Sequence, residues 1–354
     1  MSSATSELHI EPRDFEASSY TLQRLRQALF GESIVDLTDF QFPNEEAVNT
    51  FLRLHGYDAD NPLDMAALWG VHADAIQYLT EVHRYQLPGH VMAPDSIQQL
   101  FMSAGRSLDD DARFACLCLK SMHIYNHLRS RELVFNARVS EAELFGYLST
   151  KVFRVLDEMR NAGVKMLEFS AGKKKRMSLA NKLMAKRDTL ATHIFDKQRF
   201  RIVVESKDAL VFALVELLDR LVPFNYIMPG QSENRILRPD HIAAAMGLEL
   251  RQVQRYWPER VSEIAAKNIF SGAGFKTVNF VAEIPLRLDH VVDGIQPAIA
   301  VVQTEVQLVD EETNRINEEG ENAHARYKTR QSAKVRERLE GLHSGLPQLP
   351  RLKD

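Results

Sequence analysis

Residues 305–328 read EVQLVDEETNRINEEGENAHARYK, a strand pattern that runs directly into an acidic helix pattern. Alternate side chains of a strand point to opposite faces, so Gln303, Glu305 and Gln307 share one face. A lone acid between two amides is unusual for a core but compatible with a wet edge face. The stretch therefore predicts a strand with one polar side, followed by a helix.

The bulk properties fit a soluble globular protein. The chain has 354 residues, enough for two domains or for one domain with a large extension. A formal net charge of −4 argues against a protein that coats nucleic acid. No apolar run reaches the roughly 18 residues of a membrane span, and the N-terminus lacks the basic and apolar regions of a secretory signal. We expect a cytoplasmic protein with no membrane partner.

The first third is predicted to be entirely helical. Apolar residues at helical spacing predict helices over 18–31, 43–56, 64–84 and 110–132. His123 and His127 share a face of the last of these, but no third ligand lies at a matching interval, which favours packing over metal binding. Cys116 and Cys118 are too close in sequence for an ordinary disulfide and are expected to be buried thiols.

The pattern of predicted secondary structure changes from about residue 140, where strands begin to alternate with helices. Helices are predicted over 140–163 and 207–221, and strands over 164–170, 200–206, 275–288 and 298–309. This order predicts an α+β fold, a mixed β-sheet flanked by helices, behind an all-helical N-terminal region. We expect a helical region at 1–135, a catalytic-type domain at 136–330 and a flexible basic tail at 331–354.

A basic cluster follows the first predicted strand. Residues 173–176 are three lysines and an arginine, and Ser178 then caps or opens a helix that carries Lys182 and Lys186. Such a concentration of cations at a helix start suits a polyphosphate. A solvated basic loop is the alternative interpretation.

Asp196 stands just before the strand that contains Arg201. An acid at a strand edge near many cations is a candidate Mg²⁺ ligand, because Mg²⁺ in phosphoryl transfer is held by one or two carboxylates and substrate phosphates. Glu305 joins it only if the two strands are neighbours. A turn aspartate is the common alternative.

A glycine turn opens the strand at 275–288. Gly274 permits an unusual backbone, Phe275 offers a flat face for a base, and Lys276 and Asn279 add polar groups. An ordinary turn before a strand is the alternative here too.

Together these features resemble the synthetase domain of the RelA/SpoT family, which makes guanosine tetra- and pentaphosphate. The resemblance covers residues 164–328 and is closest in DKQRFRIVV, TEVQL and EEGENAHARYK. It implies a nucleotidyltransferase-like core and a pyrophosphokinase, a transferase that moves the β,γ-pyrophosphoryl group of ATP to a ribose hydroxyl with Mg²⁺. In bacterial members this activity serves the stringent response.

The resemblance also implies roles for single residues. Asp196 and Glu305 would bind Mg²⁺, and Glu305 would help to deprotonate the acceptor hydroxyl. Phe275 would stack on guanine, and Gln307 would lie near the acceptor. The remaining positions that match or adjoin the motifs, as nucleotide-binding candidates, are Lys173, Lys174, Ser178, Lys182, Arg201, Lys276, Asn279 and His324.

The chain departs from the family pattern at several positions. The family's adenine-stacking arginine falls on Gly172, and only a one-residue slip brings it to Lys173. Asn279 replaces a histidine, and Val309-Asp310 replaces Arg-Thr, which predicts an altered acceptor site. No His-Asp dipeptide occurs, so the hydrolase domain of the long members is not expected. The acceptor is left open between GDP, GTP, an adenine nucleotide and tRNA.

A helical insertion is predicted at 231–270. Ala243, Gly247 and Val253 have helix-turn-helix spacing, with Arg251 and Arg255 on the second helix. A packing or lid hairpin is the simpler interpretation. The alternatives to the enzyme are thus an inactive nucleotide-sensing module and a nucleic-acid binder built on 240–257. The 1–135 region is open to a neutralising, regulatory or dimerising role, with homo-oligomers as possible partners.

Overall fold

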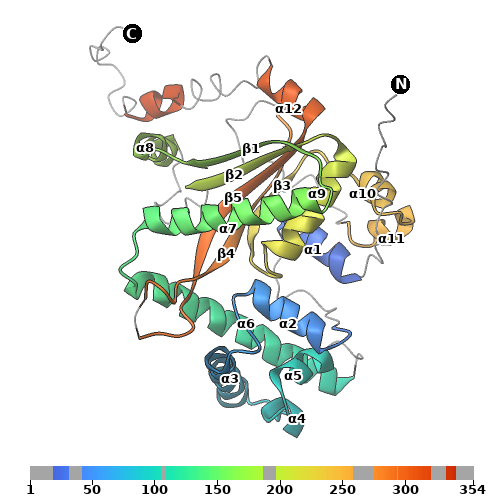
Figure 1. The fold of residues 1–354 in the computed structure, drawn as a ribbon, viewed down its shortest axis with the longest axis vertical. Coiled ribbons are helices and arrows are strands. Elements are labelled where there is room, and N and C mark those ends of the chain that lie inside the picture. The colour runs from blue at the N-terminus through green and yellow to red at the C-terminus, as the bar shows by residue number, and fades with distance from the viewer. Residues whose placement is uncertain are drawn as a thin grey trace, which may run out of the picture.

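The computed structural model describes residues 19–31, 42–104, 109–185, 197–257, 275–292, 294–319 and 332–339. The fold is α+β, with a five-stranded mixed sheet, helices packed on it and a bundle of helices at one end (Figure 1). The expected fold class, including the all-helical N-terminal region, is confirmed. None of the described helices has the length and apolar character needed to span a bilayer.

The helices of the first part are α1 (Ser19–Phe30), α2 (Glu45–Leu54), α3 (Pro62–Gln77) with a π-helical turn (Tyr78–Val82), α4 (Gly89–Met92), α5 (Ile97–Ala104) and α6 (Asp110–Asn136). Those of the second part are α7 (Glu141–Asn161), α8 (Arg176–Ala185), α9 (Lys207–Arg220), α10 (Pro239–Ala245), α11 (Leu250–Gln254) and α12 (Glu311–Glu318). The strands are β1 (Met166–Lys173), β2 (Gln198–Val204), β3 (Ile227–Asn234), β4 (Val278–Arg287) and β5 (Ile299–Asp310).

Local sequence signals set several helix ends. The Asn44 side chain accepts the Ala47 N–H at the start of α2. Ser140 and Glu143 form a reciprocal capping box at the start of α7. Gly56, two residues after α2, has a φ of +94°, a conformation that a residue with a Cβ adopts only under strain.

The strands lie in the order β1-β2-β5-β4-β3, and only the β2–β5 pair is parallel. β5 is therefore central, with β2 on one side and β4 on the other. The main core lies on the face covered by α1, α7 and α9, where Phe200, Phe280, Val306 and Leu308 are all fully buried. Figure 1 shows α7 and α9 crossing this face.

A second apolar core lies within α2, α3, α5 and α6. Ile299, the first residue of β5, packs into it and joins the bundle to the sheet. The bundle is also bonded to the sheet domain by polar groups, since His55 Nε2 lies 3.3 Å from the carbonyl oxygen of Phe224. The N-terminal bundle and the sheet are thus in direct contact.

Three features differ from the sequence-based expectations. The predicted insertion at 231–270 begins inside β3, whose Pro229 and Gly230 interrupt the alternation that marks a strand. The helix α1 belongs to the core under the sheet rather than to the bundle of the 1–135 region. Residues 332–339, within the tail that was expected to be flexible, are helical, and Val335 packs on Ala185.

Candidate functional site

The face of the sheet opposite the main core carries a row of polar side chains. In the register of the sheet, Arg199 on β2 lies beside Glu305, and Arg201 lies beside Gln307. On the other side of β5, Asn279 on β4 also lies beside Gln307. Because paired residues share a face, we call Arg199, Arg201, Asn279, Glu305 and Gln307 the polar face. β2 and β5 are thus direct neighbours, as a site shared between them requires.

Glu305 is at the centre of the polar face and is only 8% exposed. Its Oε1 accepts hydrogen bonds from Asn279 Nδ2 at 3.2 Å and from Gln307 Nε2 at 3.1 Å. Two amides from two strands therefore fix the orientation of one carboxylate. Burying an acid on a sheet requires such partners, which explains why amides rather than apolar residues flank it.

Arg201 connects the polar face to α12. Its guanidinium donates to Asn314 Oδ1 at 2.5 Å and lies 3.3 Å from Glu318 Oε1. The arginine that the sequence assigns to phosphate binding is thus held by the helix that follows β5. Any phosphate bound there would meet an arginine that is already oriented.

The basic turn, residues 173–176, lies at the end of β1 that meets the start of β2. The backbone N–H of Lys174 donates to the carbonyl of Lys197 at 2.9 Å. Lys173 Nζ lies 3.4 Å, and Lys197 Nζ 3.0 Å, from the carboxylate of Glu141. Hydrogen bonds and charge from the two lysines outweigh partial burial and hold the pKa of Glu141 below its usual range.

The helix α8 begins at Arg176, so Ser178 lies inside the turn that opens the helix and does not cap it. The Ser178 N–H donates to the Lys175 carbonyl at 2.9 Å. Ser178 is exposed, and Lys182, one turn further along α8, is half-buried. Both side chains belong to the helix that the basic turn opens.

Phe275 and Lys276 lie just before β4, at the opposite end of the polar face from the basic turn. Asn317 on α12 binds the backbone of Lys276 twice, accepting its N–H at 2.9 Å and donating to its carbonyl at 2.6 Å. Phe275 is half-buried, and the Lys276 side chain is exposed. Glu305 therefore lies between the two ends of the polar face, with the basic turn at one end and Phe275 at the other.

Val309-Asp310 was expected to alter the acceptor site because it replaces Arg-Thr of the family pattern. In the structure Asp310 has a local role. Asp310 is buried and is the N-cap of α12, where its Oδ1 accepts the Thr313 N–H at 3.1 Å. The acid therefore serves the helix start, a role that its position before an acidic helix could have predicted.

Two of the predicted site residues, Asp196 and His324, lie outside the described residues. The closest described neighbour of Asp196 in sequence is Lys197, directly before β2. Within the described ranges, no group of three or more His, Cys, Asp or Glu side chains is placed to hold a metal ion.

Some polar groups of the sheet were not predicted from the sequence. Glu283 on β4 is buried, accepts from Gln303 Nε2 at 2.8 Å and lies 3.0 Å from His127 Nδ1 on α6. The bonds from His127 and Gln303 overcome burial and lower the pKa of Glu283. The contact with His127 joins residues more than 150 positions apart, and only the fold brings them together.

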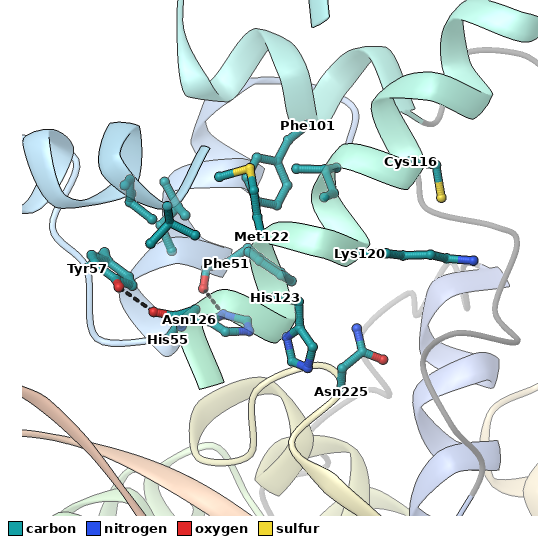
Figure 2. A pocket seen from close by; sticks show the side chains of 14 residues that line it. Phe51, His55, Tyr57, Phe101, Cys116, Lys120, Met122, His123, Asn126 and Asn225 are labelled. Carbon is teal, nitrogen blue, oxygen red and sulfur yellow. Dashed lines mark hydrogen bonds between the residues drawn. The ribbon is translucent and has the colours of Figure 1, made fainter. Parts of the chain in front are cut away.

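A cavity of about 70 Å³ lies between the bundle and the loop before β3 (Figure 2). Phe51, Phe101 and Met122 form its apolar wall, with His123 and Asn225 at its polar side. Burial lowers the pKa of His123 well below its usual value, with the charge of His127 as a smaller cause. His123 and His127 are thus packing residues, 4.6 Å apart between ring centres.

The predicted helix-turn-helix is a small hairpin, α10 and α11, packed on the main core. Ala243 and Val253 are buried, and Trp257 makes an edge contact with Phe30 at 4.8 Å between ring centres. Arg251 is engaged by Glu249 at 2.5 Å. The helix spacing is therefore explained by packing.

No protein-family profile matches the chain, and no curated protein matches it. Solved structures that resemble it include the small alarmone synthetase 1 from Bacillus subtilis, at 14% identity and a TM-score of 0.30, over 56% of this chain and 88% of that one. The same synthetase bound to its product pppGpp gives 14% and 0.29, over 55% and 86%. A GTP pyrophosphokinase family protein from Streptococcus pneumoniae gives 13% and 0.29, over 55% and 82%. Because similarities with such low TM-scores carry no argument about function, the function proposed below rests on the residues of this chain alone.

Proposed function

We propose that this protein is an ATP-dependent pyrophosphokinase that transfers the β,γ-pyrophosphoryl group of ATP to a ribose hydroxyl and releases AMP. The observation that carries the proposal is the buried Glu305 carboxylate, oriented by two amides on the polar face. Its position in the strand motif and the RelA/SpoT-like order of motifs around it indicate which reaction the site would catalyse.

The arrangement fits a reaction with two nucleotide substrates. The basic turn and α8 would bind the triphosphate of ATP, which needs several cations. The end of the polar face near Phe275 would hold the acceptor nucleoside, and Glu305 between them would take the proton of the attacking hydroxyl. Phosphoryl transfer needs mainly positioning and charge neutralisation, and it needs no covalent nucleophile from the protein.

The donor set is compatible with Mg²⁺. Mg²⁺ prefers oxygen ligands and binds through one or two carboxylates together with substrate phosphates and water. Glu305 and Asp196 would hold the ion, and when bound it would neutralise charge on the transferred phosphates. The polar face offers a carboxylate and amide oxygens but no soft ligands, which agrees with a hard cation.

The experiment that tests the function incubates the full chain with Mg²⁺, ATP labelled in its γ-phosphate, and GDP, GTP, ADP or tRNA in turn. We expect one acceptor to gain two phosphates and label, and Glu305→Gln to lower the rate at least about 100-fold by removing the charge and the base. Glu311→Gln, at an exposed acid at the start of α12, serves as the matched control and should retain the wild-type rate.

If no acceptor gains label under these conditions, or if Glu305→Gln is as active as the wild type, the proposal is wrong. Labelling of GDP or GTP would identify an alarmone synthetase. Labelling of tRNA would identify an RNA-modifying enzyme of the same chemistry.

A further inference from the structure

A cleft of about 350 Å³ opens in the sheet below the start of β2. Its walls come from β5, β4, the start of β2, the end of α6 and the start of α7. This volume is within the range of small-ligand sites, which run from about 300 to 1,000 Å³. The cleft adjoins the polar face, because Gln303 in its wall is two residues from Glu305 on the same side of β5.

The cleft exists because β5 is longer than its neighbour. The pairing of β5 with β2 begins at Glu305, so within the described residues the stretch 299–303 has no strand on that side. Three residues of this stretch, Val301, Val302 and Gln303, line the cleft.

Gln198, the first residue of β2, also lines the cleft. The residue is 3% exposed, and its Oε1 has no hydrogen-bond partner among the described residues. A buried acceptor without a partner is unfavourable, and a ligand carrying an N–H donor would satisfy it. Arg199, the next residue, belongs to the polar face, so two consecutive residues of β2 border the cleft and the polar face.

The rim of the cleft carries an aromatic ring and cations. Phe135, near the end of α6, is 84% exposed, which is uncommon for so large an apolar side chain. Arg131, one turn earlier, and Lys197 also line the cleft. A ring with a free face beside a buried amide is a combination that suits a nucleobase, which stacks on one and hydrogen-bonds to the other.

We propose that this cleft binds the adenine of a nucleotide, with Gln198 reading its amino group and Phe135 stacking on its ring. A glutamine side chain pairs with adenine through the 6-amino donor and N7. The cleft is next to the basic turn, because Gln198 pairs in register with Lys173. An adenine bound there would direct its phosphates to the cations of that turn. The substrate role of this nucleotide rests on the proposed function, whereas its binding does not.

Calorimetry on the full chain with ADP, IDP and GDP tests the assignment without turnover. IDP has a 6-oxo group in place of the amino group and so cannot donate from the 6-position to Gln198 Oε1. We expect ADP to bind at least about tenfold more tightly than IDP and GDP. Gln198→Leu should remove that preference, and Phe135→Ala should weaken ADP binding about tenfold. Phe153→Ala, at an exposed phenylalanine on α7 that does not line the cleft, is the matched control and should bind like the wild type.

The outcomes separate this inference from the proposed function. If ADP does not bind, or if Gln198→Leu keeps the preference for ADP over IDP, the adenine site is wrong even where labelled product forms. If ADP binds with these properties but no acceptor gains label, the site stands and the enzymatic proposal fails. Gln198→Leu should fold at least as stably as the wild type, since it removes an unpaired buried acceptor, so loss of folding does not obscure the result.

Discussion

Arg287 at the end of β4 donates a hydrogen bond to the carboxylate of Asp64 on α3, and Asp64 is fully buried. The same guanidinium donates to the carbonyl of Gly56 at 3.0 Å. One arginine of the sheet thus neutralises an acid of the helical bundle, and the two parts of the chain depend on each other at this point.

Arg287→Ala should therefore destabilise the protein by about 3–5 kcal/mol, because it leaves a buried carboxylate without its cation. The measurement is the free energy of unfolding in urea at pH 7.5. Adding Asp64→Asn to this variant should recover part of the loss, since a neutral amide is cheaper to bury. Arg113→Ala removes an exposed pair with Asp110 and should change stability by less than about 1 kcal/mol. A loss equally small for Arg287→Ala would show that the pair is not buried in solution.

His55 gives the protein a stability that depends on pH. Burial lowers its pKa to about 4, with the charges of His127 and Arg24 as smaller causes, against the raising effect of two backbone carbonyls. The unfolded chain, with a pKa of about 6.5, binds the proton more readily, so this contribution is full above pH 6.5 and is lost as the pH falls towards 4. The loss amounts to about 3 kcal/mol over this range.

Urea unfolding at pH 7.5, 6 and 5 checks this expectation. The wild type should lose stability steadily on acidification, and His55→Gln should lose clearly less between the same pH values. Part of the slope should remain, because burial also lowers the pKa of His123. His90→Gln, at an exposed histidine, should follow the wild type. Equal slopes for wild type and His55→Gln would contradict the buried, neutral state of His55.

Periodicity predicted the strands β4 and β5, and in β5 Val306 and Leu308 lie in the core while Glu305 and Gln307 lie on the opposite face. It missed β3, where Pro229 and Gly230 break the pattern and the register with β4 shifts. Proline and glycine at an edge strand cannot be told from a loop by local sequence alone.

The candidate site was predictable only where it is local in sequence. The order of motifs identified Glu305 and Gln307, but their shared contact with Asn279 depends on the pairing of β4 with β5. Among the described residues the Gln198 acceptor at the start of β2 has no partner, and no local residue pattern predicts that. Residue types therefore indicated the chemistry, whereas tertiary pairing set the geometry.

Asp310 is expected to act on the stability of α12 and not on the acceptor. Asp310→Ala should cost about 1 kcal/mol by removing the N-cap, while Asp310→Asn should cost less because asparagine caps as well as aspartate does. Urea unfolding measures both. With an active enzyme, Asp310→Asn should leave the KM for the acceptor within about twofold, a change below 0.5 kcal/mol. A large rise in KM for Asp310→Asn would place the carboxylate in the acceptor site instead.

The hairpin of α10 and α11 should not be a nucleic-acid reader. Its spacing is explained by burial of Ala243 and Val253 in the main core, and Arg251 is already engaged by Glu249. Arg251→Glu combined with Arg255→Glu should leave retention on DNA and RNA unchanged between 50 and 200 mM salt. A nucleic-acid binder with about 6–10 phosphate contacts would lose about 10³–10⁵ in affinity over this range. Filter binding with duplex DNA and tRNA measures this. Lys174→Glu combined with Lys175→Glu is the comparison variant, with the same change of charge. If the basic turn is a triphosphate site, this variant should lose nucleotide binding. If the hairpin variant alone loses retention on nucleic acid, the helix-turn-helix interpretation is correct and packing is not the whole reason for the spacing.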